Sequence, residues 1–155
     1  MECKKQLPEI SLTHSLGHLT GLSSRLFNRV LTSRFKQAGI YITAEQWGVI
    51  LILKQFGSLS QSQICEILYL EKSSVSRSIE VLEKNGWVHR FKSHSDNRTK
   101  LVKLTEQSLN IVVQCSDIAN GVLQDSQKEI SPENLSESEE LLGQVVTNLR
   151  SLLEL

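Results

Sequence analysis

The chain has 155 residues, of which 39% are hydrophobic and 22% charged, and its formal net charge is zero. This length fits one domain over residues 1–155, and the composition excludes a disordered or collagen-like chain. The longest apolar run, VILIL at 49–53, is far shorter than the roughly 20 residues of a membrane span, and the amino terminus has no apolar stretch typical of a secretory signal. We therefore expect a cytoplasmic protein with no membrane partner.

The zero net charge conceals an uneven distribution along the chain. Residues 1–59 hold seven Lys and Arg against three Asp and Glu, and residues 60–105 hold eight against five. Residues 106–155 hold two against nine. A basic body followed by an acidic end is compatible with nucleic-acid binding.

Apolar residues at steps of three and four predict a long first helix over about Ser11 to Gln37. A second helix follows the capping box T-x-x-Q of Thr43 and Gln46, and Gly57 ends it. A second capping box, S-x-x-Q at 60–63, predicts a short third helix before Ile64.

A fourth helix is predicted by the apolar face of Val75, Ile79 and Leu82, and Gly86 closes it. A hairpin with arms at 87–92 and 100–105 comes next, the second arm with alternating apolar residues. A fifth helix begins at 106, and a sixth opens with Ser131 as its cap and Pro132 at its first position. The expected fold class is mainly α (α+β), in the order α-α-α-α-β-β-α-α.

The short third and fourth helices, separated by about three residues, form a helix-turn-helix pattern whose second helix can enter the major groove of DNA. Its polar side carries short hydroxyls, which allow close approach, and an arginine, which can bind guanine with two hydrogen bonds. On an isolated helix such a face would simply be solvated. The hairpin directly behind it makes residues 42–105 a winged helix-turn-helix. The polar residues are Lys72, Ser73, Ser74, Ser76 and Arg77.

The tip of the hairpin, SHSDNRT at 93–99, has neither glycine nor proline. In an extended segment residues i and i+2 point to the same side, so Asp96 can hold Arg98 by a charge-assisted hydrogen bond. An arginine held forward at the tip suits a narrow minor groove. The alternative is an exposed ion pair without function.

Four segments resemble the MarR (multiple antibiotic resistance regulator) family of winged-helix transcription factors: ITAEQWGVILIL, LSQSQICEIL, KSSVSRSIEVLEKNGWVHR and DNRTKLVKLTEQ. The resemblance implies a homodimer that binds a near-palindromic operator in double-stranded DNA, usually as a repressor. Many members of the family release DNA when they bind a phenolic compound or an oxidant. By resemblance, Ser73, Ser74, Ser76 and Arg77 would face the major groove, Arg98 the minor groove, and Gln61 and Ser62 phosphate. Lys72, Lys92 and Lys100 would add phosphate contacts.

Three positions depart from the family pattern. Glu71 stands where an aspartate usually caps the recognition helix, and glutamate is a poorer cap. Ser78 replaces a usual leucine, and Val81 replaces a usual basic residue. These differences concern the operator sequence and the affinity, and leave the expected fold unchanged.

No cofactor is expected, and the sequence leaves three kinds of effector open. Cys65 is expected to be buried beside Ile64 and no cysteine lies on the first helix, which disfavours a redox switch. His14 and His18, at i and i+4, could share a metal but lack further ligands. A small aromatic effector between the first, second and fifth helices is favoured by resemblance, with Trp47 as a pocket wall or a core residue.

Residues 1–38 and 106–155 are expected to form the dimer, because apolar residues at the carboxyl end need cover. The predicted interface residues are Leu12, Leu149, Leu152 and Leu153. A winged-helix module that binds protein is the main competing hypothesis. We do not expect an enzyme, because the sequence holds no G-x-S-x-G, H-E-x-x-H, P-loop or dinucleotide fingerprint.

Overall fold

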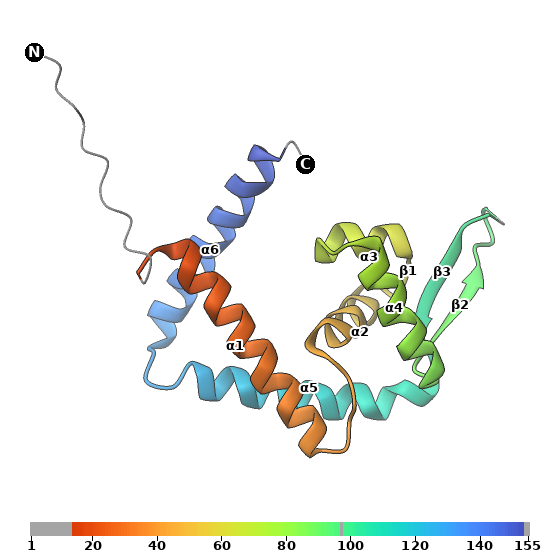
Figure 1. Ribbon diagram of the computed structural model, residues 1–155, viewed down its shortest axis with the longest axis horizontal. Coiled ribbons are helices and arrows are strands. Elements are labelled where there is room, and N and C mark those ends of the chain that lie inside the picture. The colour runs from red at the N-terminus through yellow and green to blue at the C-terminus, as the bar shows by residue number, and fades with distance from the viewer. Residues whose placement is uncertain (1–13, 97, 154–155) are drawn as a thin grey trace, which may run out of the picture. The chain divides into compact units, whose positions relative to one another are not determined.

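The computed structural model describes residues 14–96 and 98–153, and its elements are drawn in Figure 1. A first compact unit extends to Ala119, and a second begins at Asn120, inside one helix. The elements are α1 (Leu16–Gln37), α2 (Ala44–Phe56), β1 (Ser58–Ser60), α3 (Gln61–Leu68), α4 (Lys72–Lys84), β2 (Val88–Lys92), β3 (Lys100–Leu104), a 3-10 turn (Glu106–Ser108), α5 (Leu109–Ser126) and α6 (Pro132–Leu152).

The predicted fold class, mainly helical with a winged helix-turn-helix, is confirmed by this element order. The assignment of residues 1–155 to one domain remains a prediction. Within the described ranges, no helix is both long and apolar enough to cross a membrane.

Helix α1 begins later than the predicted Ser11, which lies outside the described residues. Ser15 has an extended backbone, with φ −73° and ψ 144°, and its side chain accepts a hydrogen bond from the backbone N–H of His18. A serine with this geometry is an N-cap, so the helix begins at Leu16. The predicted i, i+4 placement of two histidines on α1 is therefore wrong, because His14 precedes the helix.

The capping predictions for α2 and α3 are confirmed. Both boxes are complete, at Thr43/Gln46 and at Ser60/Gln63. In each, the cap hydroxyl accepts the backbone N–H of the glutamine, and the glutamine side-chain oxygen accepts the backbone N–H of the cap residue. Gly57, at φ 82°, ends α2 in a conformation that L side chains rarely adopt. Glu71 makes no side-chain capping bond at the start of α4, as expected of a poor cap.

The sheet has three antiparallel strands in the order β1-β3-β2, one more than the sequence predicted. Strand β1 has only three residues, of which only Leu59 is buried, so no alternation could reveal it. It pairs Leu59 with Val102, and β2 pairs Arg90 with the same residue from the other side. The wing therefore continues into a sheet anchored beside the start of α3.

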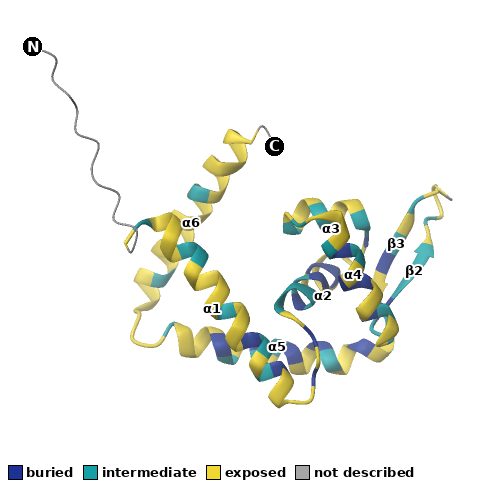
Figure 2. Ribbon diagram, viewed as in Figure 1, coloured by how far each residue is buried: buried dark blue, intermediate teal, exposed yellow. Residues whose placement is uncertain are grey.

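The core of the first unit lies between α2, α4 and the sheet, with α1 packed on α2 (Figure 2). Phe35 of α1 is fully buried and meets Trp47 of α2 edge to face, at 5.9 Å between ring centroids. Cys115 is buried, but Cys65 is only half-buried, so its predicted burial is wrong. The neighbouring Ile64 fills the core position instead, at 0% exposure.

The second unit consists of the end of α5 and α6. The Ser131 hydroxyl accepts the backbone N–H of Asn134, and Pro132 occupies the first turn, which confirms the predicted cap. No residue of α6 within the described range is buried. Because α6 carries five exposed large apolar side chains within its bounds, it is an amphipathic helix whose apolar face is uncovered in the isolated chain.

Candidate nucleic-acid interface

Helices α3 and α4 are joined by a three-residue turn that begins at Tyr69. This residue adopts the left-handed conformation, with φ 53° and ψ 47°, and its N–H bonds to the carbonyl oxygen of Cys65. A left-handed residue stops a helix and turns the chain sharply. The result is the predicted helix-turn-helix, with α4 as its second helix (Figure 1).

Helix α4 has one buried and one exposed face. Val75, Ser78, Ile79 and Leu82 face the core and are at most 4% exposed. The predicted polar residues lie elsewhere on the helix: Lys72, Ser73 and Arg77 are exposed, while Ser74 and Ser76 are half-buried. Helix α4 therefore presents a solvent-facing strip of hydroxyls and cations, while its opposite face packs in the core.

Two polar contacts hold α4 against the elements around it. The Gln61 side-chain amide donates to the backbone carbonyl of Lys72 at 3.2 Å, which ties α3 to the start of α4. The Ser78 hydroxyl donates to the Glu45 carboxylate on α2 at 2.9 Å. In the sequence, Ser78 stands out only as a departure from the family pattern. Its partly buried contact joins residues 33 positions apart, so no local sequence pattern indicates it.

The end of α4 is tied to the wing by a second carboxylate. Glu83 accepts two hydrogen bonds from Arg90 on β2, one from its backbone N–H at 3.2 Å and one from its guanidinium at 2.9 Å. The hydroxyl of Thr105 also donates to the carbonyl of Gly86, at 2.7 Å. Helix α4 and the wing are thus fastened together at the point where the chain passes from one to the other.

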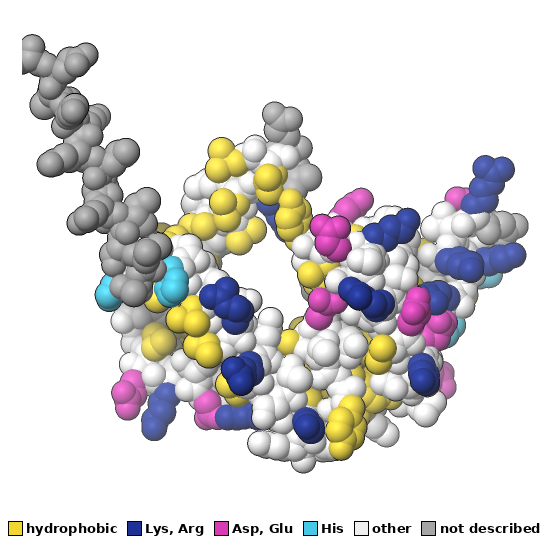
Figure 3. All heavy atoms as spheres, in the orientation of Figure 1, with side chains coloured by type: hydrophobic (Ala, Val, Ile, Leu, Met, Phe, Trp, Pro, Cys, Tyr) yellow, Lys and Arg dark blue, Asp and Glu magenta, His cyan; other side chains and the backbone are white. Residues whose placement is uncertain are grey.

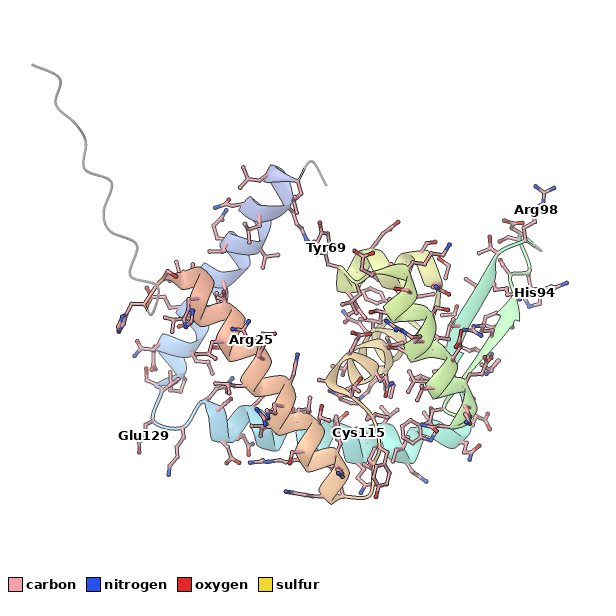
Figure 4. All side chains as sticks on the ribbon, viewed as in Figure 1. Arg25, Tyr69, His94, Arg98, Cys115 and Glu129 are labelled. Carbon is pink, nitrogen blue, oxygen red and sulfur yellow. The ribbon has the colours of Figure 1, made fainter. Side chains whose placement is uncertain are left out.

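The tip of the wing differs from the prediction in one contact. Asp96 accepts the backbone N–H of Arg98 at 2.9 Å and the hydroxyl of Thr99 at 2.8 Å, and these bonds hold the pKa of its carboxyl below the usual range. The predicted bond to the Arg98 guanidinium is wrong, because Arg98 donates to this carboxylate from its backbone N–H. Arg98 extends away from the tip (Figure 4).

Basic side chains gather around this wing, as the space-filling view shows (Figure 3). Lys92 and Lys100 are exposed, and the register places them opposite each other on β2 and β3. Gln61 is half-buried and Ser62 exposed at the start of α3. The predicted DNA-contacting residues therefore lie on α3, α4 and the wing of the same unit.

The predicted ligand residues do not form a common site. His14 and His18 are exposed at the start of α1, whereas Trp47 is 4% exposed and packs on Phe35. No group of three or more potential metal-binding side chains occurs among the described residues.

A hollow that sequence reasoning missed lies along the second half of α1. Its volume is about 370 Å³, and its lining contains Arg29, Val30, Ser33, Arg34 and Gln37. Helix α1 has three arginines and a lysine but no acidic residue, so this surface is basic.

The predicted dimer residues are exposed where the structure describes them. Leu149, Leu152 and Leu153 are 54%, 79% and 57% exposed, and Leu12 lies outside the described residues.

The fold and the exposed surface of α4 define a winged helix-turn-helix protein. Residues 42–100 match the MarR family model. A curated relative, described as an uncharacterized HTH-type transcriptional regulator YwoH of Bacillus subtilis, is 35% identical over 91 residues. That match covers 59% of this chain and 64% of the relative.

Solved structures extend the similarity to most of the chain. Apo MarR from E. coli is 25% identical, with a TM-score of 0.71, over 84% of this chain and 96% of that one. A MarR mutant from E. coli in complex with operator DNA gives a TM-score of 0.77 at 24% identity, over 88% and 99% of the two chains. BpsR of Bordetella bronchiseptica, described as regulated in DNA binding by 6-hydroxynicotinic acid, gives 0.79 at 19% identity, over 89% and 97%.

Proposed function

We propose that this protein is a homodimeric, sequence-specific DNA-binding transcriptional regulator, a repressor released by a small-molecule effector, acting in the cytoplasm without catalytic activity. The observation that carries the proposal is the exposed strip of hydroxyls and cations on α4, fastened to a wing whose arginine points outward. The fold shared with a MarR mutant bound to operator DNA supports it.

On this proposal α4 lies in the major groove. Arg77 donates two hydrogen bonds to a guanine, while Ser73 and Ser76 allow the helix backbone to approach the base edges. Arg98 enters the adjacent minor groove, where a narrow A·T-rich segment has an enhanced negative potential. Lys72 and the start of α3 contact phosphate, which adds affinity but no sequence preference.

The uncovered apolar faces support the homodimer. The exposed apolar residues of α6 run from Leu141 to Leu152, and α1 exposes others from Leu16 to Val30. Apolar patches of this kind on a soluble chain are typical of interfaces. Two copies related by a two-fold axis would place two α4 helices about 34 to 36 Å apart, one turn of DNA, and so fit a near-palindromic operator.

An organic anion is the effector class that the described surface supports best. The hollow on α1 is lined by the Arg29 guanidinium together with the Ser33 hydroxyl and the Gln37 amide. The effect of 6-hydroxynicotinic acid on BpsR is compatible with an organic acid in this role. A redox switch through Cys115 is disfavoured, because burial raises the pKa of its thiol to about 11 and keeps it protonated.

The test is selection of bound duplexes from a random DNA pool, repeated with a library of small organic acids. Enrichment of a near-palindromic sequence would support the proposal, and release by an acid would identify the effector class. Failure to enrich any sequence, together with pull-down of a specific protein, would favour the protein-binding alternative.

A further inference from the structure

Lys92 and Lys100 form a cross-strand pair near the tip of the wing. Ser93 and Thr99 are the next pair of residues toward the tip, and the Ser93 N–H donates to the carbonyl of Thr99 at 2.9 Å. Hydrogen-bonded and non-hydrogen-bonded pairs alternate along an antiparallel ladder, so Lys92 and Lys100 occupy a non-hydrogen-bonded position. The side chains of such pairs stand closest together, about 4.5 to 5.5 Å apart at Cβ.

The register also assigns this lysine pair to one face of the sheet. Side chains alternate between faces, so Lys92 shares a face with Val88 and Arg90, and Lys100 with Val102. Val88 and Val102 are buried, and Arg90 bonds to Glu83 of α4. The lysine pair therefore extends the α4 side of the wing, beyond the part that covers the core.

Two like charges directly opposite each other destabilise an antiparallel pair. The nearby carboxylates are committed elsewhere: Glu83 binds Arg90, and Asp96 binds the Arg98 N–H and the Thr99 hydroxyl. Within residues 14–96 and 98–153 no ion pair of either lysine is found. The wing thus keeps an unfavourable arrangement that an anion between the two ammonium groups would relieve.

We infer that the lysine pair is a clamp for one backbone phosphate of the DNA, adjacent to the minor groove that Arg98 enters. This inference rests on the proposed function and adds a specific site to it. Both ammonium groups contact the same phosphate, because they project from opposite strands at a single level of the hairpin. The repulsion between the two ammonium groups lowers the stability of the folded protein.

The first measurement is operator affinity for Lys92→Ala, Lys100→Ala and the double variant, each over a range of salt concentrations. Each single change is expected to weaken binding by about 3- to 10-fold. The double variant should lose less affinity than the product of the two single-variant losses. Its slope of log affinity against log salt concentration should be shallower by about 0.9, the value for one phosphate.

The matched control is Lys103→Ala. Lys103 is exposed on the same strand, but it pairs with His89 on the opposite face, and its ammonium lies over the Phe91 ring at 5.1 Å. Removing this charge from the same hairpin is expected to leave operator affinity within about twofold of the parent.

The second measurement separates a binding role from a structural one. Lys92→Glu turns the repulsive pair into an attractive one, so Tm should rise by about 1 to 4 °C. The same change should weaken operator binding more than Lys92→Ala does, because a carboxylate repels phosphate. Opposite signs in stability and affinity are the signature of a site kept for its ligand.

Three results would overturn the inference. Unchanged affinity of both alanine variants, with the parent binding its operator, would remove the clamp and leave the proposed function intact. If the two losses in operator affinity multiply and the salt-dependence slope changes by about 1.8, the two lysines contact separate phosphates. A parent protein that binds no duplex DNA would remove the proposed function and the clamp together.

Discussion

Asp96 accepts the backbone N–H of Arg98 at 2.9 Å, so this carboxylate shapes the turn rather than restraining the guanidinium. The turn is completed by the Thr99 N–H, which donates to the carbonyl of Asp96 at 3.0 Å. Asparagine and aspartate side chains commonly build such turns by bonding to the backbone two residues on. The arginine at the wing tip is therefore positioned through its main chain.

The first prediction concerns Asp96. Asp96→Ala should weaken operator binding although it removes a negative charge, because the turn that presents Arg98 is lost. Asp96→Asn should bind more tightly than Asp96→Ala, since the amide oxygen can still accept the Arg98 N–H. Fluorescence anisotropy with a labelled operator measures both. Tighter binding by Asp96→Ala than by the parent would show that electrostatic repulsion dominates.

The pH dependence of the turn follows from the lowered pKa of Asp96, which ordinarily lies near 3.8. The charged form is the one that the folded turn stabilises. The contribution of the charged form to the stability of the turn is therefore fully present at pH values above the ordinary pKa. It is lost as the pH falls through the lower pKa of the folded state. Wing geometry, followed by NMR shifts of the Arg98 and Thr99 amides, should stay constant from pH 7 down to about 5.

The second prediction separates the two arginines. Arg77→Ala should cost about 1 to 3 kcal/mol of binding free energy and relax the preference at one base pair in each half-site. Arg98→Ala should weaken binding mainly at operators with A·T-rich flanks. Selection experiments with each variant report the two patterns. Identical specificity profiles for both variants would contradict the assignment of the arginines to different grooves.

The third prediction concerns the contact between Ser78 and Glu45. Ser78→Ala should lower the free energy of unfolding by about 1 to 3 kcal/mol, because it leaves a half-buried carboxylate without its donor. Combining it with Glu45→Ala should cost less than the two single changes added together. Urea denaturation of the four proteins measures this coupling. Simple additivity would mean that the hydrogen bond contributes nothing to stability.

The fourth prediction tests the dimer. Leu152→Glu places a charge on a residue that is 79% exposed in the single chain, so it should leave the fold intact and split the dimer into monomers. Glu140→Gln, also on an exposed position of α6, is the control and should remain dimeric. Light scattering at micromolar concentration distinguishes the two. A monomeric parent protein would contradict the predicted interface.

Local sequence signals accounted for most of the fold. The two capping boxes, Gly57, Gly86 and Ser131 with Pro132 all act within about four residues of themselves, and each marks a helix end in the structure. The start of α1 was misplaced because apolar periodicity alone does not reveal which of several serines becomes the cap.

The contacts that the sequence did not reveal join distant residues or involve the backbone. Ser78 and Glu45 are 33 positions apart, and β1 joins the sheet only because β3 comes back beside it. At the wing tip the residues were identified, but the bond was assigned to the wrong donor. A charged side chain suggests an ion pair, whereas an aspartate in a tight turn finds a backbone N–H closer at hand.

The link from Glu83 to Arg90 has a consequence for the DNA that this protein would recognise. It joins α4 to the wing through both the backbone and the side chain of the same strand residue, which couples the positions of the two elements. On the proposed function, the distance between a guanine read by Arg77 and an A·T-rich flank read by Arg98 is set by the protein. Each inserted base pair moves the flank about 3.4 Å along the duplex and turns it by roughly 35°. In each half-site, base substitutions between the two recognised positions should therefore weaken binding less than insertion of a base pair between them.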